Sequence, residues 1–160
     1  MSIEAKVDFS SALAGLERLA GEARVSLARS MAVAGGQVFR DEAKLRAPVE
    51  TGRLREAIYL AFRDGKSTDQ QVMYAVTWNS KKAPHGHLLE FGHWQPYKVV
   101  RKPDGSYVSD KSQPLPAPKW VPARPFLRPA LDAAMSRARE AMLKRGSERL
   151  TELLRGGGEE

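Results

Sequence analysis

The run HGHLLEFGHW, residues 85–94, contains all three histidines of the chain and one glutamate. His85 and His87 are spaced like a pair of metal ligands, and Glu90 follows His87 by three residues, about one helical turn. A catalytic zinc site needs three converging protein ligands and an open position. Here His85 precedes the short helix that the run predicts, His93 follows it, and the chain has no HExxH motif. We therefore predict that the histidines are loop residues, and we expect no metal and no cofactor.

The other residue types that act in catalysis also lack the sequence context of an active site. The chain of 160 residues has no cysteine, which excludes disulfides, thiolate metal ligands and cysteine nucleophiles. Its serines have no nucleophile-elbow context, and no glycine-rich loop joins a strand to a helix to cradle a phosphate. The neighbouring carboxylates Asp41 and Glu42 have the context of a solvated helix surface. We therefore predict that the protein is not an enzyme.

The charge balance favours acidic partners. Lysine and arginine number 26 against 19 acidic residues, which gives a formal net charge of +7 and makes DNA one candidate partner. Most basic residues alternate with acidic ones, as in SRAREAMLKRGSERLTELL, which is typical of a solvated surface. No apolar run approaches the roughly 20 residues that span a bilayer, and the first residues lack the pattern of a secretory signal. We expect no contact with a membrane.

The spacing of apolar residues predicts an order of helix, hairpin, short helix, hairpin and helix. Spacings of three, four and seven indicate the long helices, and alternation around short polar turns indicates the hairpins. We predict one domain over 1–160, with a helical segment at 9–46, a hairpin at 53–79, a short helix at 85–92, a second hairpin with a proline-rich connector at 93–123, a helix at 125–154 and a tail at 155–160.

Three local features of these elements are open to test. Glycine destabilises a helix interior, so Gly21 could interrupt the first helix, whereas the small residues Gly35 and Gly36 would let another backbone approach. The segment 54–62 fits either a strand or a short helix. Five prolines within 110–125 predict an extended connector rather than a strand.

These elements predict an α+β fold, in which a small antiparallel β-sheet packs against a long N-terminal helix and a long C-terminal helix. In the last helix, the residues expected to face the sheet are Leu127, Leu131, Ala134 and Met142. The hairpin within 93–123 is too polar to seat firmly in a core, so we expect a mobile arm that a neighbouring subunit orders. The alternative is that this hairpin adds to the edge of the main sheet.

Three motifs in this order resemble the tail-completion family of long-tailed bacteriophages, whose members are also known as minor tail or head–tail joining (neck) proteins. The motifs are AKLRAPVETGRLREAI, the aromatic strand YAVTW followed by EFG, and PARPFLRPAL. A longer spacer before EFG and the long stretch 93–122 depart from the simplest family pattern. On this resemblance, the residues that maintain the structure are Pro48, Thr51, Gly52, Phe91, Gly92, Pro125, Phe126 and Pro129.

The resemblance implies a non-enzymatic virion protein that forms a six-fold ring at the phage neck, around the channel through which DNA passes. Its expected partners are copies of itself, head connector or adaptor proteins, and tail terminator or tail tube proteins, with non-specific contact to DNA in the channel. It would reach the virion from the host cytoplasm. The alternatives are a basic DNA-binding module and, with less support, a small metal-dependent hydrolase.

The residues most suited to contact subunits or partners are charged or aromatic. Phe91 is expected to pack into the core, and Glu90 is expected to form a salt bridge with Arg128 within or between subunits. The candidates for such contacts are Glu90, Arg128, Lys98, Arg101, Lys102 and Tyr107.

Overall fold

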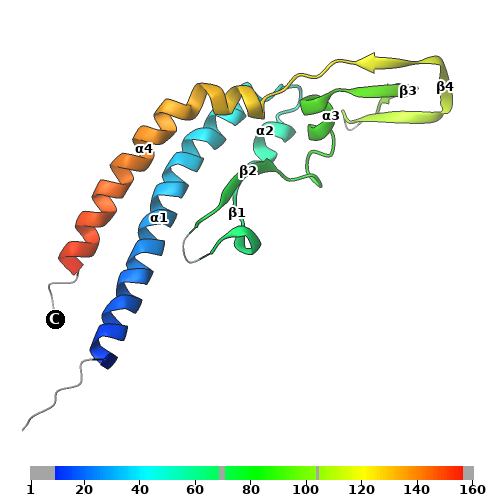
Figure 1. Ribbon diagram of the computed structural model, residues 1–160. Coiled ribbons are helices and arrows are strands. Elements are labelled where there is room, and N and C mark those ends of the chain that lie inside the picture. The colour runs from blue at the N-terminus through cyan, green and yellow to red at the C-terminus, as the bar shows by residue number, and fades with distance from the viewer. Residues whose placement is uncertain (1–9, 69–70, 104, 157–160) are drawn as a thin grey trace, which may run out of the picture.

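Two long helices, α1 (Ser10–Arg46) and α4 (Leu127–Gly156), lie side by side and run in opposite directions (Figure 1). The structure is a computed structural model that describes residues 10–68, 71–103 and 105–156. α1 continues without interruption through Gly21, so the suggested break there is wrong. Residue 9 and residues 157–160 of the predicted helix and tail lie outside the described part.

Two reciprocal contacts between glycine and methionine set the close approach of α1 and α4. A Cβ atom at Gly35 would lie 2.6 Å from Cγ of Met142, and one at Gly146 would lie 2.9 Å from Sδ of Met31. In each contact, a flexible methionine on one helix fills the space that a glycine leaves on the other. A Cβ at Gly35 would also lie 3.3 Å from the carbonyl oxygen of Ala138, so the prediction that the small residues of α1 admit a second backbone is confirmed there.

Both of the structures considered for 54–62 occur in succession. A short helix α2 (Arg53–Ala57) leads directly into strand β1 (Ile58–Phe62), and a 3₁₀ turn η1 (Asp64–Lys66) follows. β1 pairs antiparallel with β2 (Tyr74–Trp78), so that Ile58 lies opposite Trp78. This sheet packs on α1, where the side chain of Leu60 occupies the space over Gly36.

The buried core lies where α1, α2, β1 and the start of α4 meet. Its largest fully buried side chains are Phe126 and Ile58. The ring of Phe126 packs edge to face against Trp78, with the ring centroids 6.0 Å apart. Small residues fill the rest, so the elements pack closely. The buried cluster comprises Ala43, Ala47, Leu54, Ala57, Ile58, Ala83, Phe126 and Ala130.

The second hairpin forms a sheet of its own. Helix α3 (Gly86–Phe91) leads into β3 (His93–Arg101), which pairs with β4 (Tyr107–Val121) and with no strand of the first sheet. Figure 1 shows this hairpin projecting beyond the helices, with β4 turning back at its tip. The alternative of one extended sheet is therefore wrong, whereas the predicted α+β class, with both long helices and an extra hairpin, is confirmed.

The prediction that the prolines exclude a strand is also wrong. Pro114 lies opposite Tyr97, and Pro116 and Pro118 fall where the pairing register shifts between Pro114 and Lys119. Because the ladder is already interrupted at such irregularities, the missing N–H of proline leaves no donor position unfilled there.

Helix α4 packs mainly against α1 rather than against a sheet. Ala130 and Ala134 are fully buried, whereas Leu131 is 41% exposed, so the prediction that Leu131 faces the sheet is wrong. The prediction that Ala134 faces inward is right, but its neighbour is α1 and not the sheet, because alanines allow the two helices to approach closely. Within the described residues, no helix is both long enough and apolar enough to cross a membrane.

Candidate functional site: a cavity between the first turn, helix α3 and the hairpin

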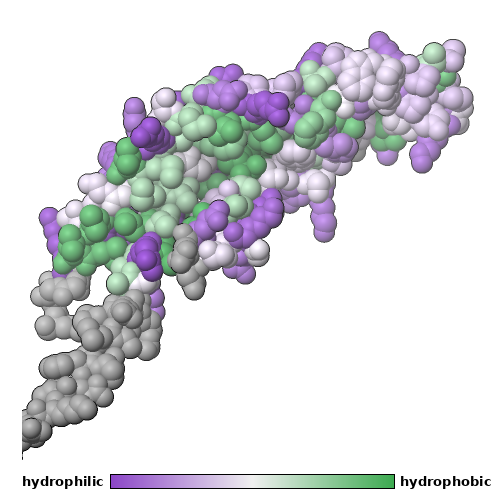
Figure 2. Space-filling view, viewed as in Figure 1, coloured by the Kyte–Doolittle hydropathy of each residue, from purple (hydrophilic) through white to green (hydrophobic). Residues whose placement is uncertain are grey.

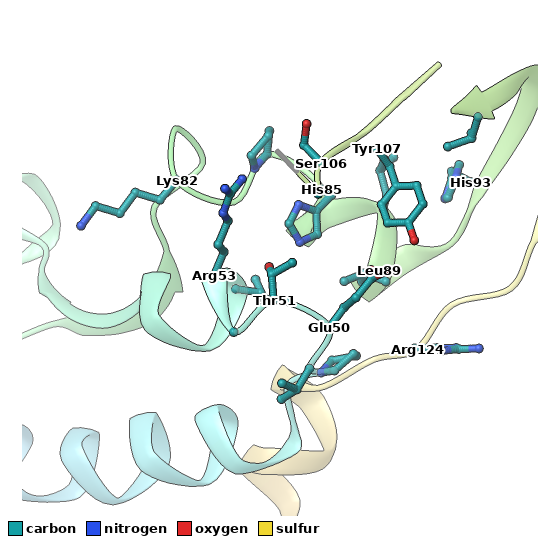
Figure 3. A pocket seen from close by; sticks show the side chains of 18 of the residues that line it. Glu50, Thr51, Arg53, Lys82, His85, Leu89, His93, Ser106, Tyr107 and Arg124 are labelled. Carbon is teal, nitrogen blue, oxygen red and sulfur yellow. The ribbon is translucent and has the colours of Figure 1, made fainter. Parts of the chain in front are cut away.

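A cavity of about 640 Å³ lies among three segments that the sequence motifs contribute (Figure 3). One wall is the turn between α1 and α2, residues 48–54, and a second wall is α3 with the loop before it. The third wall is the part of the β3–β4 hairpin next to its turn, including Val99 and Tyr107. The family-like motifs APVETGRL and HLLEFG therefore face each other across one space.

The turn that forms the first wall begins where α1 ends. The N–H of Ala47 donates to the carbonyl of Ala43 at 2.9 Å, and Pro48 follows immediately. Gly52 has φ 78°, a left-handed conformation that favours glycine, and its carbonyl accepts the N–H of Glu56 at 3.0 Å. The side chain of Thr51 makes no hydrogen bond within the described part of the chain, and Thr51 lines the cavity.

Glu90 fixes the second wall to helix α4. Its Oε2 accepts hydrogen bonds from the backbone N–H groups of Phe126 at 2.8 Å and Leu127 at 3.2 Å. The first N–H groups of a helix have no partner within the helix, and the positive end of the helix dipole favours a carboxylate there. Glu90 therefore caps α4 from a position 36 residues earlier in the chain.

Within one chain, this cap takes the place of the salt bridge predicted between Glu90 and Arg128. Arg128 is exposed in the first turn of α4, and within the described residues it has no ion pair with Glu90. A second bond, from the N–H of Arg124 to the carbonyl of Leu89 at 2.7 Å, reinforces the junction between α3 and α4. Pro125 precedes α4 by two residues rather than lying in its first turn, whereas the first turn does include Pro129.

The other two residues of the EFG motif behave differently from each other. Phe91 is 73% exposed, so the prediction that it packs into the core is wrong. Gly92 has φ 73°, as predicted, and a Cβ there would lie 2.9 Å from both the carbonyl oxygen of Val121 and the N atom of Ala123. Because Glu90 turns toward α4, Phe91 at the end of the short helix points into solvent.

Two of the three histidines line the cavity, and the histidines form no metal cluster among the described residues. His85 and His93 line the cavity, whereas His87 is exposed and is not among the lining residues. Nδ1 of His93 is buried and has no hydrogen-bond partner in the described part of the chain.

The charges around the cavity are mostly basic. Arg53, Lys82 and Arg124 line it together with Glu50 (Figure 3). A hydrogen bond with the Glu50 carboxylate raises the pKa of the Tyr107 phenol above its usual range. This arrangement suits a segment of another protein, since guanidinium and ammonium groups bind carboxylates while apolar wall residues contact the rest of the segment.

The remaining candidates lie on the hairpin beside the cavity and are not among its lining residues. Lys98, Arg101 and Lys102 are all exposed. The guanidinium of Arg101 lies over the ring of Tyr107, 5.9 Å from its centroid. The structure thus brings together Pro48, Thr51, Gly52 and Tyr107 around the cavity, with the three cations exposed on the hairpin beside it.

Two residues that the sequence analysis did not select are Trp94 and Trp120. They lie opposite each other in β3 and β4, and their rings pack edge to face with centroids 5.4 Å apart. The available signal was their residue type, because tryptophan within polar strands is enriched at protein interfaces.

The comparisons with known proteins give one match. A family model described as "Bacteriophage HK97-gp10, putative tail-component" matches residues 11–92, just over half of the chain. The matched segment runs from the start of α1 through α3 and ends at Gly92, so the β3–β4 hairpin and α4 lie beyond it. No curated protein and no solved structure matches the chain.

Proposed function

Because the chain belongs to the HK97-gp10-like family of phage tail components, we propose that it is a structural subunit that forms a ring at the phage neck, where it completes the tail and joins it to the head connector. A tail component is part of the virion and contacts other structural proteins of the phage. The ring, its six-fold symmetry and its place around the DNA channel are our proposal. The expected partners are head connector or adaptor proteins and tail terminator or tail tube proteins.

The observation that carries this proposal is the joining of the family motifs at one place in the fold. The matched segment provides α1, the first sheet and α3, and the carboxylate of Glu90 in EFG caps α4 at PARPFL. The motifs therefore serve to hold elements together, which is a structural role. In the proposed ring the exposed cations of the hairpin, Lys98, Arg101 and Lys102, contact a neighbouring protein or the DNA in the channel.

The proposal is tested by removing the subunit from a phage that carries it and observing whether heads and tails still join. A stop codon early in the coding sequence should give filled heads and separate tails in electron micrographs, and a plasmid copy should restore joined particles. A reconstruction of the virion should then place the chain in a ring at the neck. Joined particles without the protein, or density for it elsewhere in the virion, would contradict the proposal.

The basic hairpin favours a DNA-binding module as the second candidate. Such a module would retard short duplexes as a monomer or dimer, and each phosphate contact would contribute about −0.9 to the slope of log affinity against log salt. Replacing Lys98, Arg101 and Lys102 together by alanine would then lower the steepness of that slope by about 3. A ring subunit should instead assemble with copies of itself or bind a connector. The triple-alanine variant of such a subunit should either still join heads to tails or fail only at the joining step.

A further inference from the structure

Three large aromatic side chains are exposed together where α3 meets the β3–β4 hairpin. Phe91 is 73% exposed, Trp94 is 63% exposed and Trp120 is 46% exposed. The rings of Trp94 and Trp120 are in contact, and the ring of Trp120 also lies against Gly92, next to Phe91. We call these three residues the aromatic patch. Exposed aromatic residues that lie together mark a protein-binding surface.

A second exposed apolar surface lies on the C-terminal half of α4. Leu143 is 60% exposed, Leu150 is 48% exposed and Leu154 is 72% exposed. Their spacings of seven and four place them on one face of the helix, which we call the leucine patch. The turn at Gly146 packs against Met31 of α1, yet the leucines remain in solvent. Figure 2 shows hydrophobic surface reaching this end of the helical pair.

The two patches of one chain are too far apart to cover each other. The aromatic patch lies near the start of α4, whereas Leu143 is 16 residues after Leu127 and therefore about 24 Å further along the helix. Figure 1 shows the same separation, with α3 near the start of α4 and the end of α4 far from it at the lower left. Among the residues that the structure describes, neither patch is covered.

The areas suit a stable contact between the two patches. At about 150–250 Å² for each aromatic side chain, the aromatic patch exposes roughly 400 Å², and the leucine patch exposes an area of the same order. Since apolar atoms make up only about 57% of a typical interface, covering both patches corresponds to a total of at least about 1,200 Å². That value lies within the range of specific interfaces, about 1,200–2,000 Å².

We propose that the aromatic patch of one subunit packs against the leucine patch of a second copy of this chain. This inference rests on the proposed ring and names its contact. A contact between two different surfaces runs head to tail, so each added copy still presents one free patch of each kind until a ring closes. A second copy fits as the occupant because every chain supplies both surfaces in equal number.

Engineered cysteines test the contact cleanly because the chain has no cysteine of its own. Trp94→Cys and Leu150→Cys proteins are prepared separately, mixed, and oxidised under conditions that form disulfides. The mixture should give at least about ten times more crosslinked dimer than either protein alone, as a contact worth at least 1.4 kcal/mol would. The matched control replaces Leu150→Cys by Lys144→Cys, which is exposed on another face of α4, and should give only the background yield.

The crosslinking result tests this contact independently of whether the protein forms a ring. If the mixture gives no more dimer than the control, the contact is wrong, whether or not the protein forms rings. Rings in electron micrographs together with that result would leave the proposed function standing and remove only this interface. If Trp94→Cys instead crosslinks to itself, the aromatic patch forms a two-fold contact and the head-to-tail arrangement is overturned. Both positions are exposed, so melting temperatures close to wild type should accompany every sample.

Discussion

At the scale of single residues, Glu90 has the clearest structural role. Its carboxylate is the acceptor for two N–H groups at the start of α4, which would otherwise face a partly buried junction. Glu90→Ala should therefore lower the free energy of unfolding by about 0.5–2 kcal/mol, the usual cost of losing an N-cap. Urea unfolding measures this change.

Glu90→Gln is the matched control for the charge. An amide oxygen still accepts a hydrogen bond, so this variant should lose less stability than Glu90→Ala. An exposed glutamate elsewhere on α4, changed as Glu140→Ala, should have an effect within about 0.5 kcal/mol. Equal stability of Glu90→Ala and wild type would show that the cap contributes nothing.

The ion pairs near the end of α4 predict a dependence on pH. Hydrogen bonds from Arg145 and Arg149 lower the pKa of Glu152 from 4.5 to about 2. A lowered pKa in the folded state adds stability above the unfolded value, and this stability is lost as the pH falls from 4.5 toward 2. The stability difference between wild type and Glu152→Gln should shrink over that range. A difference that stays constant would mean that the pairs do not form in solution, and added salt should also reduce it.

At the scale of elements, the contact between α1 and α4 depends on glycine at particular positions. Gly35→Ala places a Cβ 2.6 Å from Cγ of Met142 and 3.3 Å from the carbonyl of Ala138, so the helices must shift. We expect a loss of about 1–3 kcal/mol from this overpacking. On the same helix, Gly21→Ala meets only an Arg24 side-chain atom at 4.0 Å and should gain about 0.5–1 kcal/mol.

A second substitution checks the cause of that loss. Met142→Ala removes the atoms that the new Cβ meets, so the double variant Gly35→Ala with Met142→Ala should be less destabilised than the sum of the two single variants. Simple additivity in thermal unfolding would show that the two residues do not meet.

The buried face of α4 gives a further pair of variants. Ala134 is fully buried, so Ala134→Asp places an unpaired charge in the helix interface and should cost several kcal/mol, enough to unfold a marginal domain. Leu131 is 41% exposed, so Leu131→Asp should cost much less. Circular dichroism melting distinguishes the two, and a larger effect at Leu131 would mean that the helix is rotated.

The sequence predicts an element well where contacts between neighbouring residues determine its structure, and poorly where contacts with distant residues do. The long helices follow from periodicity, and Gly52 and Gly92 from their turn motifs. The rest needed tertiary information. Gly21 is tolerated because α4 packing stabilises α1 as a whole, Phe91 is exposed because Glu90 takes the inward position, and Pro114 enters a strand because the pairing there is irregular. None of these contacts is encoded in neighbouring residues.

At the scale of the whole molecule, the β3–β4 hairpin projects beyond the helical body, while residues next to its turn, such as Val99 and Tyr107, line the cavity. It is a two-stranded sheet whose valines at 99, 100 and 108 are more than a third exposed, and an isolated hairpin is marginal in water. The amides from Lys98 to Lys102 should therefore exchange with solvent faster than those in the centre of α1. Assembly should slow this exchange, as measured by hydrogen–deuterium exchange with mass spectrometry. Strong protection in the monomer would show that the hairpin is rigid without a partner.

The two ends of this hairpin meet at one point. His93 pairs with Val121, and the backbone at Gly92 nearly touches that of Ala123, while Arg124 is already bonded to α3. Everything from 93 to 121 is therefore a side branch of the chain path, and α3 and α4 keep their junction whatever length the branch has, since lengthening a surface loop costs little free energy. The branch is an exchangeable module: a shorter turn, a different hairpin or a small reporter domain could be grafted there, and phages could diversify this tip without redesigning the subunit that carries it.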